Sequence, residues 1–136
     1  MSRQWLFKTE PGQYSYDKLE REKKAVWDGV TNNLALKHLR EIRMGDKILI
    51  YHSGDEKAVV GLAQAISDPY PDPRENDEKL VVINIKPVRR LSSPLSLSQI
   101  KTVDELKDFD LVRLPRLSVM PIPGNYWIKL RDVMSF

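Results

Sequence analysis

The sequence has no cysteine and only two histidines among its 136 residues. Disulfide bonds, thiolate zinc sites, iron–sulfur clusters and cysteine nucleophiles are therefore excluded, and a metal site would have to be built mainly from carboxylates. No cofactor motif is present, so we expect neither a metal nor a cofactor. Because proteins without disulfides are typical of reducing compartments, we expect a cytoplasmic protein in a bacterium, or a nuclear protein in a eukaryote.

Long apolar runs are also missing from the sequence. The longest fall far short of the ~20 residues that a membrane-spanning helix needs, and residues 1–8 lack the apolar core of a signal peptide. Gly-rich phosphate-binding loops, EF-hand spacing and internal repeats are absent as well. We therefore expect no membrane partner. The length indicates a single domain over residues 1–136, which we expect to be a monomer.

Candidates for nucleophilic catalysis are few. Ser53 directly follows His52 in a predicted strand, and adjacent strand residues point to opposite faces, so the two side chains cannot easily meet. His38 lies on the apolar side of a predicted helix, where a core histidine explains it better than a catalytic base does. The Gly-x-Ser-x-Gly motif of many hydrolases is absent. We therefore predict that the protein is not an enzyme.

The charge balance is slightly basic, since 22 lysines and arginines against 19 acidic residues give a net charge of +3. From Lys79 to Lys101 the chain carries basic residues and no acidic one, and Lys86, Arg89 and Arg90 lie in this segment. Such a segment could track a phosphate backbone. Its charges could equally protect an exposed strand edge from aggregation, so both explanations remain open at this point.

Apolar periodicity predicts an α+β domain built on a small, curled, barrel-like sheet of about five to six strands with short flanking helices. Ser15 is the expected N-cap of the first helix, and the apolar run after Lys47 indicates a strand buried on both faces. Gly61 marks a bulge or a close backbone approach. We predict strands over residues 4–9, 47–53, 58–67, 80–90 and 118–122, and helices over residues 16–23, 34–42, 103–109 and 126–134.

Three local patterns carry more detailed predictions. The spacing of Thr102 and Glu105 is that of a capping box and predicts the start of the helix over residues 103–109. Tyr70–Pro73 is expected to form a rigid loop, because its two prolines restrict the backbone. The second predicted helix has one apolar stripe, formed by Leu34, Ala35, His38, Leu39 and Ile42.

The segment from Trp27 to Asn32 combines a large aromatic ring, a glycine that lets a ligand approach the backbone, and an amide that both donates and accepts. Such a set suits a base extruded from a nucleic acid, since stacking on an aromatic side chain contributes about 1–3 kcal/mol per base. Asn32 and Ser53 could then read the hydrogen-bonding edge of that base. Composition alone favours a structural explanation, with Trp27 in the core and Asn32 as the N-cap of the second helix.

These residues belong to a series of motifs that extends from Trp5 to the C-terminus. In chain order the motifs are Trp5-x-x-Lys8-x-Glu10-Pro11, Trp27-Asp28-Gly29-Val30-x-Asn32, Tyr51-His52-Ser53, Gly61, Tyr70-Pro71-Asp72 and Arg116-Leu117-Ser118-Val119-x-Pro121. The series resembles the EVE domain, a family with the PUA-like fold that is related to the YTH readers of methylated adenine. The resemblance implies a curled β-barrel with a pocket for a modified base.

The resemblance also implies roles for the residues of its second motif. Trp27 would form the aromatic wall of the pocket, and Gly29 and Val30 its backbone rim. Asn32 would read the edge of the base.

The other motifs imply the rest of the pocket. Ser53 would form the opposite lip with Tyr51 packed behind it, and Lys8 and Glu10 would hold the first strand near the site. The chain departs from its relatives at Leu80, where they carry a tryptophan shortly before the long strand. The missing aromatic corresponds to one stacking contact, about 1–3 kcal/mol.

The function implied by the resemblance is that of a non-enzymatic binding module. It would recognise a modified base, such as 5-methylcytosine, 5-hydroxymethylcytosine or N6-methyladenine, in DNA or RNA. Lys86, Arg89 and Arg90 are expected to contact its phosphates. The alternative is a PUA-like module for a small molecule or a protein that does not bind nucleic acid, and both Leu80 and the modest charge keep it open.

Overall fold

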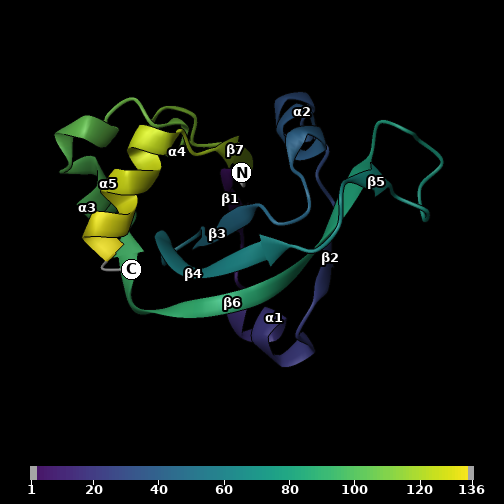
Figure 1. Cartoon of the computed structure of the whole chain (residues 1–136), viewed down its shortest axis with the longest axis horizontal. Helices are drawn as coiled ribbons and strands as arrows, with labels where there is room; N and C mark the ends of the chain where they lie inside the picture. Colours follow the sequence, from purple (N-terminus) through teal and green to yellow (C-terminus); the bar gives the residue numbers. More distant parts are fainter. Residues whose placement is uncertain (1–2, 135–136) are drawn as a thin grey trace.

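The computed structural model describes residues 3–134, and within that range seven strands form a mixed, curled sheet flanked by short helices. The strands are β1 (Gln4–Thr9), β2 (Ala25–Trp27), β3 (Lys47–His52), β4 (Ala58–Ala65), β5 (Tyr70–Pro71), β6 (Val81–Ser96) and β7 (Val119–Pro121). The helices are α1 (Tyr16–Glu22), α2 (Asn33–Glu41), α3 (Leu97–Lys101), the 3-10 helix η1 (Asp104–Leu106), α4 (Asp110–Arg113) and α5 (Gly124–Met134). The strand order is β2-β6-β4-β3-β1-β7, with β5 paired to β6 (Figure 1). The predicted α+β class with a curled sheet is confirmed.

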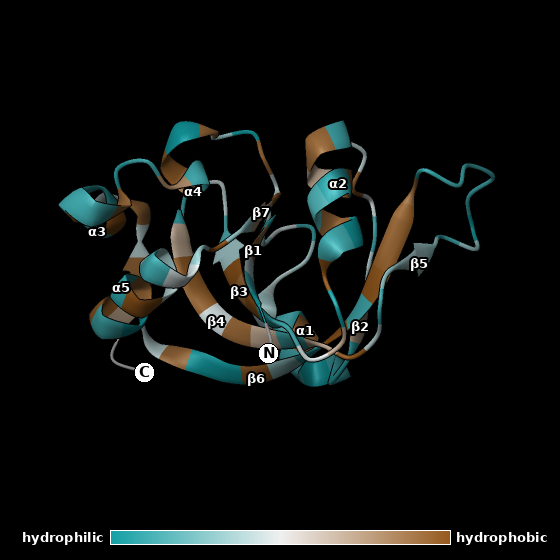
Figure 2. Ribbon diagram, turned by 45° about the horizontal axis from the view of Figure 1, so that its top comes forward, coloured by the Kyte–Doolittle hydropathy of each residue, from teal (hydrophilic) through white to brown (hydrophobic). Residues whose placement is uncertain are grey.

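Strands β1 and β3 form a parallel pair within the sheet, in which Gln4 lies opposite Lys47. Trp5–Phe7 and Ile48–Ile50 are fully buried in this pair. Strands covered on both faces read as continuous apolar runs rather than alternating ones, which is why the sequence correctly indicated a buried strand here. Figure 2 shows the contrast with β6, where the middle of the strand is hydrophilic.

Strand β6 extends to Ser96, well past the predicted end at residue 90, because register shifts let it bend along β4. Gly61 lies opposite Arg90, whereas Val59 lies opposite Leu95, so β6 carries extra residues between these two pairs. Bulges of this kind increase the local twist of a sheet. The bulge predicted at Gly61 is confirmed, and it contributes to the curl seen in Figure 1.

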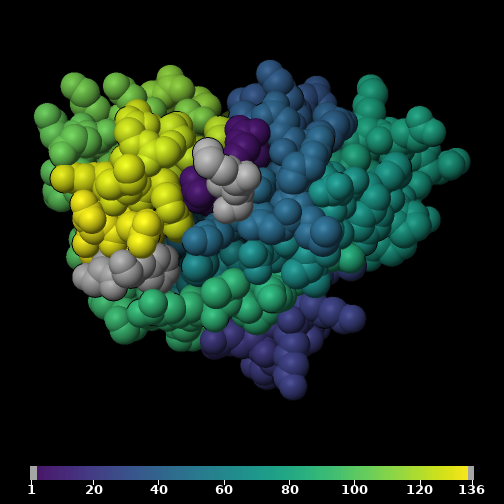
Figure 3. All heavy atoms as spheres, viewed as in Figure 1, coloured from purple at the N-terminus to yellow at the C-terminus, as the bar shows by residue number. Residues whose placement is uncertain are grey.

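Helix α1 packs against β6 and begins as predicted. The hydroxyl oxygen of Ser15 accepts a hydrogen bond from the Lys18 N–H at 3.1 Å, and the helix ends at Lys23, whose φ of 68° breaks the helical path. Tyr16 and Leu19 form the buried face. In the space-filling view α1 projects from the body of the molecule below β6 (Figure 3).

Helix α2 packs against β6 and β7 through a face slightly different from the predicted one. Ala35, Leu36 and Leu39 are buried, whereas Leu34 is 41% exposed. Successive helix residues are about 100° apart, so a face centred between Ala35 and Leu39 includes Leu36 and turns Leu34 away. The prediction that Leu34 belongs to the inner stripe was therefore wrong.

The prediction of one helix over residues 103–109 was also wrong. The capping box lies at the start of α3, where Ser96 and Gln99 bond reciprocally. Thr102 instead closes that helix, because its hydroxyl donates to the Gln99 carbonyl oxygen at 2.7 Å. Thr102 has helical dihedral angles and its hydroxyl is used at the end of α3, so it does not cap a new helix. The chain continues as η1, which begins after Val103 without a side-chain cap, and then as α4 after Phe109.

The remaining elements agree more closely with the sequence. Helix α5 begins at Gly124, slightly before the predicted start, and buries Trp127 and Leu130. The expected rigid loop at Tyr70–Pro73 opens with the two-residue strand β5, in which Tyr70 lies opposite Val82. In the described residues 3–134, no helix has the length and apolar character needed to cross a membrane.

Candidate functional site

A cavity of about 570 Å³ opens where β1 ends. Small-molecule and cofactor sites have volumes of roughly 300–1,000 Å³, so the cavity is of a suitable size for a ligand. The residues that line it come from four parts of the chain: the end of β1 with the residue after it (8–10), the turn that follows (13 and 14), the end of β2 with its connection to α2 (26–32), and positions 116 and 118 before β7.

Hydrogen bonds fix the end of β1 beneath this cavity. The Lys8 N–H donates to the Ser118 carbonyl oxygen, and the Ser53 N–H donates to that of Thr9, both at 2.9 Å. The Thr9 hydroxyl donates to the carbonyl oxygen of Tyr14 at 2.8 Å and thereby closes the following turn. These hydrogen bonds fix the backbone that forms one wall of the cavity.

Trp27 lines the cavity although only 8% of it is exposed. Its ring lies 5.1 Å from the Phe7 ring, and Tyr14 meets it edge-on at 5.9 Å. Such aromatic contacts fix the plane of an indole. Trp27 is thus a core residue, as the structural explanation of the sequence required, and its remaining surface belongs to the cavity.

The loop after Trp27 brings accessible backbone to the cavity. Gly29 has a φ of +75°, a conformation that favours glycine, and no atom lies within 4 Å of the position that its Cβ would take. Val30 is buried in the core and anchors the loop. A ligand can therefore approach the peptide groups around Gly29 without meeting a side chain there.

Asn32 lines the cavity and caps α2 at the same time. Its Oδ1 accepts a hydrogen bond from the Ala35 N–H at 3.0 Å, so the predicted N-cap is confirmed. One lone pair of the oxygen is used in this way, and the N–H donors of the amide remain available for a ligand. They match an acceptor, such as a ring nitrogen or a carbonyl oxygen.

Lys8 contributes a partly buried ammonium group. Its Nζ donates to the Pro115 carbonyl oxygen and lies 5.7 Å from the centre of the Tyr51 ring. Burial lowers the pKa of Lys8 below its usual value, because desolvation disfavours the charged form. Glu10 and Arg116 also line the cavity, which therefore carries charges of both signs.

Asp28 lines the cavity, and its charge is compensated by Arg74, which does not line it. Arg74 forms ion pairs with both Asp28 and Asp72, the latter at 3.2 Å. Hydrogen bonds from Arg74 hold the pKa of Asp72 below its usual range. A second contact, from the Arg40 guanidinium to the Lys79 carbonyl oxygen at 2.8 Å, joins the same loop to α2. The loop between β5 and β6 is thereby attached beside the cavity.

Ser53 and Tyr51, expected to form and support one lip of the pocket, do not line the cavity. Tyr51 is 3% exposed and lies behind Lys8. Strand β1 has β3 on one side and β7 on the other, and the cavity is bordered on the β7 side. Arg116 and Ser118, which precede β7, therefore occupy the place that Ser53 was expected to take.

Leu80 does not line the cavity either. It is half-buried against the core, and its N–H donates to the Asp77 carbonyl oxygen at 3.1 Å. The aromatic side chains in the cavity wall are those of Trp27 and Tyr14, which meet edge-on.

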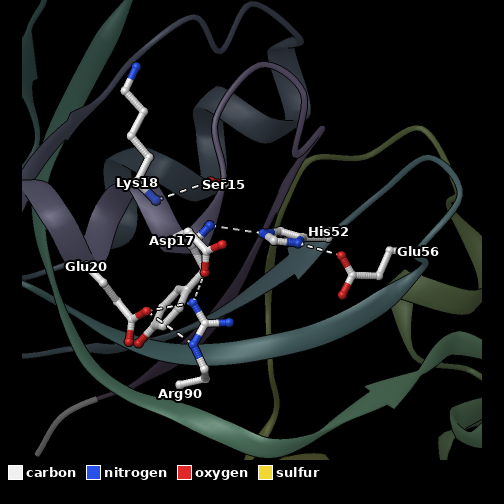
Figure 4. Close-up of polar contacts among 8 residues, drawn as sticks. Ser15, Asp17, Lys18, Glu20, His52, Glu56 and Arg90 are labelled. Carbon is white, nitrogen blue, oxygen red and sulfur yellow. Dashed lines mark hydrogen bonds and ion pairs between the residues drawn. The ribbon is translucent and has the colours of Figure 1, made fainter.

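Lys86, Arg89 and Arg90 are not among the residues that line the cavity, so any contact they make with phosphate would lie outside it. Arg90 instead forms ion pairs with Asp17 and Glu20 of α1, with its Nη2 2.6 Å from the Glu20 carboxylate. Figure 4 shows the Arg90 guanidinium beside these two carboxylates. Its charge attaches α1 to β6.

Sequence reasoning missed Tyr14, Arg116 and Ser118 as residues of the cavity wall. Arg116 and Ser118 belong to the last of the EVE-like motifs, but no local pattern shows which strand that motif will join. Tyr14 carried a weak signal, since it is an aromatic residue in the turn that directly follows the first strand.

Neither histidine lines the cavity. The His52 Nε2 accepts a hydrogen bond from the Tyr16 N–H at 3.0 Å, and its Nδ1 lies 2.8 Å from the Glu56 carboxylate (Figure 4). His38 contacts the Trp5 ring, and burial lowers the pKa of His38. No group of three His, Cys, Asp or Glu side chains in the described part of the chain could hold a metal ion. The aromatic rings of Trp27 and Tyr14 and the amide of Asn32, which do line the cavity, suit stacking and hydrogen bonding.

Comparison with known protein families gives a match over nearly the whole chain. The EVE domain model matches residues 3–132. Thymocyte nuclear protein 1 of Mus musculus is 28% identical over 156 residues, which cover 90% of this chain and 69% of the mouse protein.

Solved structures agree with this match. A protein of Rhodopseudomonas palustris solved by NMR is 36% identical, with a TM-score of 0.90, over 97% of this chain and 92% of its own. The human THYN1 protein in complex with 5-methylcytosine containing DNA is 24% identical, with a TM-score of 0.90 over 99% of both chains, and at that identity the likeness shows the fold. The resemblance drawn from the motifs, and the PUA-like fold that it implied, are confirmed.

Proposed function

Because the chain belongs to the EVE domain family, we propose that it is a non-enzymatic module that binds a modified base of DNA in the cavity at the end of β1. One observation carries the proposal: the Trp27 ring, the accessible backbone at Gly29 and the amide donors of Asn32 line a single cavity. The complex of the human THYN1 protein with 5-methylcytosine containing DNA supports this class of ligand.

The chemistry of the cavity wall suits a base with an exocyclic amino group. Stacking against Trp27 contributes about 1–3 kcal/mol. The Asn32 donors pair with an acceptor of the base, and the Glu10 carboxylate accepts from the amino group that cytosine and adenine have and thymine lacks. Val26 is 49% exposed in this wall and offers apolar contact to a methyl group. One methyl in an apolar site yields roughly 1–3 kcal/mol of discrimination.

In this proposal the phosphates of the bound strand contact Arg116, and not the three basic residues of β6 that the sequence indicated. Arg116 lines the cavity, whereas Lys86, Arg89 and Arg90 do not. In this proposal Arg116 therefore takes the role that the sequence had assigned to the three residues of β6.

Titrations of labelled oligonucleotides test the proposal. The strands differ in one base, which is cytosine, 5-methylcytosine, 5-hydroxymethylcytosine, adenine or N6-methyladenine, with matched RNA strands alongside. We expect at least about fivefold tighter binding of one modified base, the lower end of the discrimination that one methyl supplies. Equal affinity for all strands, with little dependence on salt, would instead indicate a small-molecule or protein-binding module.

The variant Asn32→Asp sharpens this test. Aspartate caps a helix as well as asparagine does, so α2 is preserved while the amide donors are lost. Asn33→Asp is the matched control, because it adds the same charge at an exposed neighbour that does not line the cavity. We expect Asn32→Asp to weaken binding of the preferred strand by about tenfold more than Asn33→Asp, as the loss of a hydrogen bond to a buried ligand would. Equal effects of the two variants would contradict the proposed role of Asn32.

A further inference from the structure

A second hollow adjoins the cavity. It has a volume of about 340 Å³ and lies between the start of α2 and the segment that leads into β7. Asn32 and Arg116 line both hollows, so the two are continuous along the surface.

The wall of this second hollow is mainly apolar. Leu34 projects from the first turn of α2 and is 41% exposed, away from the face by which α2 packs on the sheet. Leu114 and Pro115 face it from the other side. Lys8 donates to the Pro115 carbonyl oxygen, so this wall is attached to the floor of the cavity. The hollow therefore has a fixed position relative to the proposed base site.

The rim of the second hollow is cationic. Arg113 is held by Asp110 at 3.1 Å and by the Asp108 carbonyl oxygen. Arg116 is exposed, and no carboxylate of residues 3–134 lies within ion-pair distance of it. An uncompensated positive charge thus lies where the two hollows meet.

We propose that the second hollow receives the nucleotide next to the modified one in the same DNA strand, with Arg116 bound to the phosphate between them. This inference rests on the proposed function. Consecutive nucleosides in a strand are joined by one phosphate, and the two hollows are joined by one exposed arginine. The apolar faces of Leu34 and Leu114 contact the flanking base or sugar, and such contacts are tolerant of sequence because every base has an apolar face.

The test compares a free nucleoside with a strand. The probes are the modified nucleoside that the oligonucleotide series selects and a single-stranded oligonucleotide that carries the same base in its middle. Leu34→Ser removes apolar surface only from the second hollow, and Ile128→Ser, at a more exposed position of α5 outside both hollows, is its control. We expect Leu34→Ser to lower the affinity for the oligonucleotide by about fivefold, because it removes apolar surface that the flanking nucleotide would bury, and to leave the nucleoside affinity unchanged.

A salt series tests the phosphate contact separately. Each phosphate contact to single-stranded DNA contributes about 0.7 to the slope of log affinity against log salt. Arg116→Gln should reduce the slope by about that amount, whereas Arg131→Gln, an arginine exposed on α5, should leave it unchanged.

The outcomes separate the inference from the proposed function. If the strand binds and Leu34→Ser acts no differently from Ile128→Ser, the inference is overturned and the base site stands. If the nucleoside binds too weakly to measure, the two variants are compared on the oligonucleotide alone, and equal affinities again overturn it. If no modified strand is preferred, the proposed function fails and the inference fails with it.

Discussion

The ring of Tyr16 lies directly on the backbone of Gly61. A Cβ at Gly61 would come within 2.4 Å of the Tyr16 Cζ atom, and the Tyr16 hydroxyl donates to the Leu62 carbonyl oxygen at 2.7 Å. The contact joins the first turn of α1 to the bulge at which β4 and β6 change register. Position 61 therefore requires glycine, because the Tyr16 ring occupies the space that any side chain would need.

Replacing Gly61 by alanine should destabilise the protein. A methyl at this position collides with a fully buried ring, and overpacking of this kind costs about 1–3 kcal/mol. Urea denaturation measures the loss in the free energy of unfolding. Gly124→Ala is the control, since nothing lies within 4 Å of its Cβ position. Tyr16→Leu should cost less in the Gly61→Ala background than alone, and additive losses would show that the two residues do not collide.

His52 is expected to hold the start of α1 through the Tyr16 amide (Figure 4). Because Nε2 accepts this bond, the proton of the neutral ring lies on Nδ1, where it is donated to Glu56. His52→Leu should cost about 1–3 kcal/mol, because it leaves the buried N–H without an acceptor. Glutamine places an oxygen near the Nε2 position, so His52→Gln should recover part of the loss.

Hydrogen exchange at the Tyr16 amide provides the direct measurement for this prediction. We expect faster exchange in His52→Leu than in His52→Gln. Glu56→Gln is the control, since its amide oxygen still accepts from Nδ1. Unchanged protection of the Tyr16 amide in His52→Leu would show that the bond to His52 does not restrain α1.

Local sequence patterns were sufficient where a residue acts on its chain neighbours. Ser15 and Asn32 bond to amides three residues ahead, so their caps could be read from the sequence. The apolar run of β3 likewise reflects burial of the strand itself. The capping box failed as a guide at Thr102, because the same residue also satisfies the end of the preceding helix.

The cavity could be predicted only in part, because its wall depends on which strands become neighbours. The segment from Trp27 to Asn32 was identified correctly as part of one wall, since it is contiguous. Ser118 replaced Ser53 because β7 rather than β3 borders the cavity, and no local signal determines that arrangement. The ion pair of Arg90 could not be predicted for the same reason, since its partner Asp17 is distant in the sequence.

The position of Arg90 leads to a prediction about binding. Arg90→Gln removes its ion pairs to Asp17 and Glu20, and exposed pairs contribute up to about 1 kcal/mol. Because Arg90 does not line the cavity, the variant should lose a little stability and keep its affinity for the preferred oligonucleotide. Urea denaturation and the oligonucleotide titration measure the two effects. A lower salt slope in Arg90→Gln would restore β6 as a phosphate-binding strand.

Tyr14 leads to a prediction about alkaline pH. Burial, and then the hydrogen bond and charge of Glu22, raise the pKa of Tyr14 above the ordinary value of 10.0. The stabilisation is complete below that pH, where the phenol is protonated in both states. It is lost as the pH rises from about 10 through the higher pKa of the folded state. The free energy of unfolding should therefore fall above pH 10, and it should fall less steeply in Tyr14→Phe.

Some alkaline loss should remain in Tyr14→Phe, because burial also raises the pKa of Tyr16 and of Tyr51. Glu22→Gln separates the charge from the burial, since it keeps an acceptor for the phenol while removing the carboxylate. In that variant Tyr14 should ionise at a lower pH than in the parent protein, as followed by the ultraviolet absorbance of tyrosinate. Identical absorbance titrations of the parent and Glu22→Gln proteins would mean that the charge of Glu22 does not act on Tyr14, and that burial and the hydrogen bond set its pKa.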